Sequence, residues 1–170
     1  MFILLLITTM SILFSATGCA ICQKSDKPGD INLYHYRMTS LPAFHVREYE
    51  LKYSADGDLL LDRIDGGTEV VTYRVDSEVA KKVGEMVSSY KLKDLERSYE
   101  PPFQVFDGWM WDLYIKYPSS SISSGGSNAL PPKIQEEGIN AINAYLDSVA
   151  ASCSEEDIVG KMSYFDWKRG

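Results

Sequence analysis

Residues 107–117 read DGWMWDLYIKY, and this stretch, continued to residue 149, decides the fold. Alternate residues from Trp109 to Tyr117 are apolar, which is typical of a strand with one buried face. A Pro-Ser corner, a short second strand and a glycine-rich loop follow. Pro131-Pro132 then suits the start of a helix, because the first helical position needs no N–H donor. The stretch therefore predicts two strands, a loop and a helix.

The chain before this stretch predicts a meander and a further helix. Strands are expected over residues 43–53, 59–64 and 68–75. An Asp-Gly pair separates each from the next, and Gly allows the positive φ of a tight hairpin. A helix begins at Asp76 or Ser77, because apolar residues then recur at helical spacing. The order β-β-β-α-β-β-α predicts an α+β fold, with an antiparallel sheet of about five strands and two helices packed on one face.

Two further expectations concern burial within these elements. In the strand over residues 43–53, the face that carries Glu48, Glu50 and Lys52 becomes charged toward its end, so we expect water there. In the last helix, the apolar spacing predicts a single stripe against the core. This stripe consists of Ile134, Gly138, Ala141, Ile142, Tyr145 and Val149.

The first residues have the features of an export signal. Residues 2–14 are almost entirely apolar, but a bilayer span takes about 20 residues. The sequence Ser-Ala-Thr-Gly then precedes Cys19. Small residues directly before a Cys resemble the lipobox of bacterial lipoprotein precursors. The resemblance implies that Cys19 carries diacylglycerol after cleavage, and that this lipid holds the protein at a membrane of the bacterial cell envelope, facing the periplasm or the exterior.

Two other interpretations of the same residues stay open. The segment is a cleaved signal without lipid, or it is an uncleaved anchor over residues 2–22. In the second case Lys24 and Lys27 flank its C-terminal side, which would leave the domain in the cytoplasm. Under the lipoprotein interpretation the chain has four parts: a signal peptide (1–18), the lipidated Cys with a tether (19–32), a single α+β domain (33–151) and a partly docked C-terminal tail (152–170).

The chain has three cysteines. If Cys19 carries lipid, Cys22 and Cys153 are a candidate disulfide pair, since an exported compartment permits one. The alternative is two unrelated thiols, because sequence alone does not determine connectivity.

The net charge of -7 bears on possible partners. It disfavours nucleic acid and anionic lipid headgroups, because both need a cationic surface. The two histidines, His35 and His45, have no metal-ligand spacing with each other or with a Cys, so we expect neither a metal nor another cofactor. The expected partners are the membrane, through the lipid, and an envelope protein or glycan.

An aromatic group is the first candidate binding surface. It consists of Tyr99, Phe103, Phe106, Trp109 and Trp111. Exposed aromatic side chains dominate many recognition surfaces, so this group could line a groove for sugar, peptide or protein. The alternative is that these residues form the core and its cover.

The loop Gly125-Gly126-Ser127-Asn128 is the second candidate. Backbone N–H groups before a helix can hold an anion. The alternative is a turn with an Asn or Ser cap, and the two prolines that follow remove two donors.

No catalytic motif is present, since the chain has no Gly-x-Ser-x-Gly and no anchored set of nucleophile, base and oxyanion site. We therefore expect a cell-envelope lipoprotein that is not an enzyme and acts as a binding or interaction module. The alternatives are a small envelope hydrolase or inhibitor-like factor that uses the 125–128 loop, and a purely structural lipoprotein.

Overall fold

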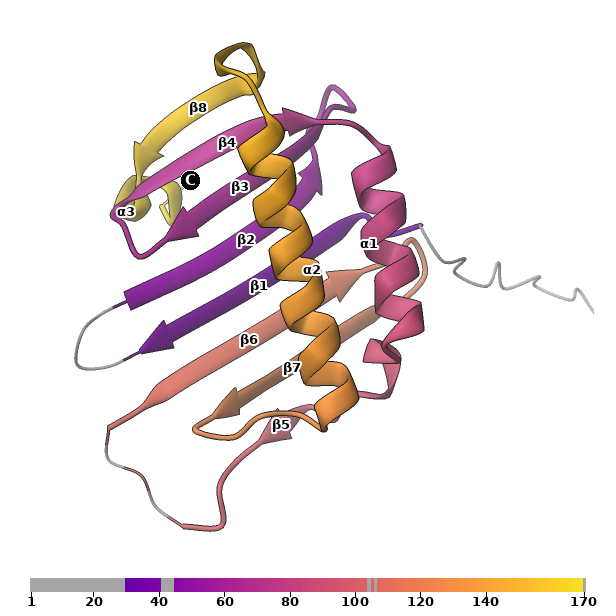
Figure 1. The fold of residues 1–170 in the computed structure, drawn as a ribbon, viewed down its shortest axis with the longest axis vertical. Coiled ribbons are helices and arrows are strands. Elements are labelled where there is room, and N and C mark those ends of the chain that lie inside the picture. Colours follow the sequence, from indigo (N-terminus) through magenta and orange to yellow (C-terminus); the bar gives the residue numbers. More distant parts are fainter. Residues whose placement is uncertain (1–29, 41–44, 104, 106, 170) are drawn as a thin grey trace, which may run out of the picture.

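The computed structural model describes residues 30–40, 45–103, 105 and 107–169, which form one sheet with two long helices on one face (Figure 1). The strands are β1 (Leu33–Ser40), β2 (His45–Tyr53), β3 (Leu59–Asp65), β4 (Glu69–Val75), β5 (Ser98–Tyr99), β6 (Trp109–Lys116), β7 (Ser121–Ser127) and β8 (Ile158–Ser163). The α-helices are α1 (Glu78–Ser89), α2 (Lys133–Ser152) and the short α3 (Tyr164–Trp167).

The sheet order is β5-β7-β6-β1-β2-β3-β4-β8, with β1 near the centre. All pairs between described strands are antiparallel except β5 with β7. The α+β class is confirmed, but the predicted number of about five strands is wrong, since the described residues form a sheet of eight. The predicted strands did not include β1; β8 lies in the predicted tail, and β5 is too short for any periodic signal.

The helix-covered face holds the main core. Trp111, Leu113, Ile115 and Tyr117 are all buried, so the predicted core face of β6 is confirmed for these residues. They pack with the aromatic and aliphatic side chains of β1, β2 and β3 and with α1 and α2. Tyr34 is fully buried there, and its hydroxyl donates a hydrogen bond to Asn143 Oδ1 on α2 at 2.9 Å.

The predicted stripe of α2 is wrong in part. Ile134 is exposed, whereas Ile139, Leu146 and the polar Asn143 are buried. The predicted stripe passed over the apolar Ile139 and Leu146, and a pattern of apolar residues could not include Asn143. Asn143 is tolerated in the core because its side chain accepts the Tyr34 hydroxyl.

The ordered domain begins before its predicted N-terminal limit, and the predicted tail docks on the sheet. Ile31, which we had placed in the tether, is 3% exposed, and Asn32 N donates to Lys116 O at 2.7 Å. At the other end, β8 pairs with β4, and Tyr164 N donates to Thr68 O at 2.7 Å as α3 begins. We call residues 158–169 the C-terminal arm.

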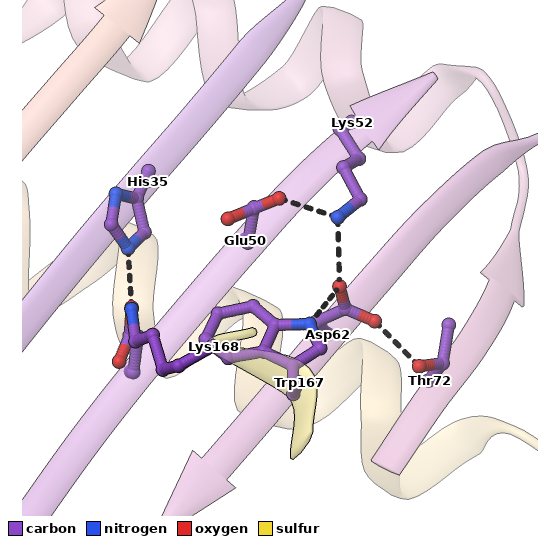
Figure 2. A network of polar contacts seen from close by, with 8 residues as sticks. His35, Glu50, Lys52, Asp62, Thr72, Trp167 and Lys168 are labelled. Carbon is purple, nitrogen blue, oxygen red and sulfur yellow. Dashed lines mark hydrogen bonds and ion pairs between the residues drawn. The ribbon is translucent and has the colours of Figure 1, made fainter. Parts of the chain in front are cut away.

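The arm makes one prediction for β2 wrong. The charged face of this strand was expected to be solvated, yet Glu48 is 1% exposed and Asp62, on the same face of β3, is also buried. Trp167 of the arm donates a hydrogen bond to Asp62 (Figure 2), and Lys168 donates one to Glu48. Because the helices cover the other face, the arm gives this half of the sheet a second covered side.

Candidate functional site

The aromatic group of the sequence separates into different environments. Trp111 is 2% exposed, and its ring stacks on Tyr99 with centroids 5.9 Å apart. Its Nε1–H donates to Ala129 O at 2.9 Å, so Trp111 is a core residue whose polar atom is satisfied. Trp109, two positions earlier on the same face, is only partly buried. Phe103 is 69% exposed and Phe106 lies outside the described residues.

Trp109 lines a cavity of about 270 Å³ between the sheet and the first turns of α2. We call this cavity the aromatic pocket. Its walls come from β1, β6, the segment before α2, and α2 itself. The lining residues are Tyr36, Met38, Trp109, Trp111, Leu130, Pro131, Glu136, Ile139 and Asn140.

Three side chains supply the polar groups of the pocket: Tyr36, Glu136 and Asn140. Tyr36 is 7% exposed, and burial raises its pKa to about 12, although Arg47 partly opposes the rise. The hydroxyl is therefore a neutral donor near neutral pH. Within the described residues none of the three side chains has a hydrogen-bond or ion-pair partner. Each can thus face a ligand without first breaking an internal bond.

The structure contradicts the predicted loop conformation of residues 125–127. Gly125, Gly126 and Ser127 belong to β7, where both glycines pair with β6 and with β5. Gly125 N donates to Arg97 O, so this N–H is not available to an anion. Asn128 follows with φ 51, and its Oδ1 accepts from Trp109 N at 3.0 Å.

Close packing explains why glycine occupies this part of β7. A Cβ on Gly126 would lie 2.4 Å from both Ala129 O and Trp111 Nε1. Gly126 therefore brings the backbone close to the Trp111 indole.

The charged cluster under the C-terminal arm is a second candidate (Figure 2). Lys52 Nζ lies 2.5 Å from Glu50 Oε1 and 3.2 Å from Asp62 Oδ2. Asp62 also accepts hydrogen bonds from Thr72 Oγ1 at 2.6 Å and from Trp167 Nε1 at 3.0 Å. Burial lowers the pKa of Lys52, but the two carboxylates outweigh this effect and raise it. The charges compensate each other, as in a structural network.

Glu48 joins the same network from β2. His35 Nε2 lies 2.5 Å and Lys168 Nζ 2.6 Å from Glu48 Oε1. Burial alone would raise the pKa of Glu48, but the hydrogen bonds and charges of these partners lower it. Glu48 is therefore an ionised group that joins the arm to the sheet.

The cysteine predictions concern both ends of the chain. Cys153 follows the last residue of α2, and burial, together with Asp157, raises the pKa of its thiol. Cys19 and Cys22 lie outside the described residues, as does the whole export signal. Lipidation and the Cys22–Cys153 pair therefore stay predictions.

Sequence reasoning missed several residues of the pocket. Tyr36 and Met38 belong to β1, where the alternation of Tyr34, Tyr36 and Met38 was a usable signal for an inward face. Glu136 lies in the first turn of α2, where the helix dipole favours an acidic residue whether or not it has another role. Nothing local relates it to Trp109, since the pocket joins residues far apart in sequence.

Comparison with known proteins finds neither a matching family model nor a matching curated sequence. None of the helices in the described part of the chain is both long and apolar enough to cross a bilayer.

Proposed function

We propose that this chain is a lipid-anchored binding module of the bacterial cell envelope, and that the aromatic pocket is its ligand site. The observation that carries the proposal is the partly buried Trp109 beside unpartnered polar groups in one apolar cavity. Ligand sites are commonly concave and apolar, with a few polar groups that orient the ligand. The pocket has this composition.

The position of the site on the fold supports a preformed pocket. Tyr36 and Trp111 stand on two neighbouring central strands, and Ile139 stands on α2, which packs on them. Their side chains are buried, so ligand binding would need little ordering of the wall. A rigid wall with one partly exposed indole suits recognition.

The hydrolase alternative loses its proposed site, because residues 125–127 are paired strand residues and Asn128 bonds to Trp109. The structural alternative gives no role to a partly buried Trp109 in an apolar cavity. The binding module is therefore the function that the geometry supports best.

Binding can be tested with fluorine NMR on protein labelled with 5-fluorotryptophan, because the chain has only three tryptophans. Indole and cyclohexanol are suitable first probes of an apolar cavity. We expect them to shift the Trp109 resonance and to leave Trp167, on the opposite face of the sheet, unchanged. Trp109→Ala should abolish probe binding, whereas the exposed Phe103→Ala should preserve it. Equal shifts at Trp109 and Trp167, or none with any small probe, would contradict the proposal.

The lipid anchor has its own test, motivated by the small residues before Cys19. Cys19→Ala should prevent lipidation, leave the precursor unprocessed by the lipoprotein signal peptidase, and remove metabolic labelling with a palmitate analogue. Cys22→Ala is the matched control and should keep both. Unchanged processing and labelling of Cys19→Ala would show that no lipid is attached there.

A further inference from the structure

We infer that the aromatic pocket binds a small free quaternary ammonium compound. This inference rests on the proposed function and names the class of its ligand. Such a cation has an apolar surface of methyl groups and a charge that it cannot lose. The pocket offers a matching set of groups: three aromatic side chains, an unpaired carboxylate and aliphatic walls.

The aromatic contribution comes from Tyr36, Trp109 and Trp111, which all line the cavity. The π face of an aromatic ring attracts a cation within about 6 Å of its centre, and Trp does so best. Alkylated ammonium groups are bound in this way because their methyl groups also bury apolar surface. A primary ammonium is more strongly hydrated, so it would lose more hydration free energy on entering an apolar cavity.

The electrostatic contribution comes from Glu136. Within the described residues no Lys, Arg or His lies within ion-pair distance of its carboxylate, whereas the next residue, Glu137, lies 3.7 Å from Lys133. Arg47 on β2 also acts on the Tyr36 hydroxyl, but it is paired with Asp65 at 3.3 Å. A pocket with an unbalanced carboxylate favours a cation, and the net charge of -7 gives the whole protein the same preference.

The size of the cavity limits the ligand. A volume of about 270 Å³ exceeds the roughly 150 Å³ of an engineered cavity that holds benzene. It therefore accommodates a trimethylammonium group with a short polar substituent. The partly exposed Trp109 and the exposed Leu130 leave an opening at the rim. These dimensions favour a free compound of the size of choline.

Choline and its neutral isostere 3,3-dimethylbutan-1-ol separate charge recognition from apolar fit. We would titrate both into the full-length protein in phosphatidylglycerol nanodiscs, whose lipids carry no ammonium group, and follow heat and the Trp109 fluorine signal. Choline should bind about 10-fold more tightly than the isostere, which corresponds to a desolvated cation–π contact with a nearby carboxylate. Glu136→Gln should lower choline affinity about 10-fold and leave the isostere within 2-fold. Glu137→Gln is the matched control and should change neither.

The possible results have distinct meanings. Tighter choline binding that depends on Glu136 supports the inference. Equal or tighter binding of the neutral isostere, or choline binding that ignores Glu136→Gln, overturns the ligand class but leaves the pocket as a binding site. Failure of choline, the isostere and the apolar probes to bind overturns the proposed function and the ligand class together. A change with Glu137→Gln as large as with Glu136→Gln would also overturn the specific role of Glu136.

Discussion

Trp111→Ala is expected to lower the free energy of unfolding by about 3–5 kcal/mol, the usual cost of removing a buried tryptophan. The indole is 2% exposed, stacks on Tyr99 and fills the space beside Gly126. Its removal also leaves Ala129 O without its donor. Urea unfolding followed by circular dichroism measures the loss.

Trp109→Ala is the matched control, since this residue lies on the same strand and the same face but is only partly buried. We expect a loss of about 1 kcal/mol, near the centre of the range for single substitutions. The two variants thus separate a residue that stabilises the core, Trp111, from a residue that lines the pocket, Trp109. A loss from Trp109→Ala as large as from Trp111→Ala would show that both indoles are core residues.

Glu48→Ala is expected to destabilise the protein by about 2–3 kcal/mol, because it removes a buried carboxylate from two cationic or donor partners. Lys168 and His35 are partly exposed, so water compensates some of the loss. The effect should include release of the C-terminal arm, which the fluorine signal of Trp167 reports. Glu50→Ala is the control on the same face and should cost under about 1 kcal/mol, because its partner Lys52 keeps Asp62.

The same residue predicts a pH dependence. The pKa of Glu48 is lower in the folded state than its ordinary value of 4.5. Its contribution to stability is therefore complete above pH 4.5 and is lost as the pH falls through the lower folded value. Glu48→Gln should be less stable than the unaltered protein at neutral pH, and the two should converge in acid. If the stability of the two proteins fell in parallel down to pH 3, the charge of Glu48 would not stabilise the docked arm.

Local pattern determined several elements of this protein. The alternation after residue 107 correctly predicted the core face of β6, because a strand exposes each side chain to one of two faces. The Asp-Gly pairs correctly separated β2, β3 and β4, since positive φ is a local property; Gly57 and Gly66 have φ of 89 and 67. The small residues before Cys19 are likewise a local signal, and they still predict an export address.

Only the tertiary structure decided burial where distant segments meet. The sequence predicted that Glu48 faces solvent, but in the fold it contacts Lys168, which lies 120 positions later in the chain. Gly125 and Gly126 looked like a loop because their composition is that of a turn, but pairing on both sides makes them strand. The aromatic pocket joins Tyr36, Trp109 and Glu136 from three separate elements. Sequence alone thus determined the conformations that neighbouring residues impose on the backbone, whereas the pocket and the arm depend on contacts that form only when the sheet order brings distant side chains together.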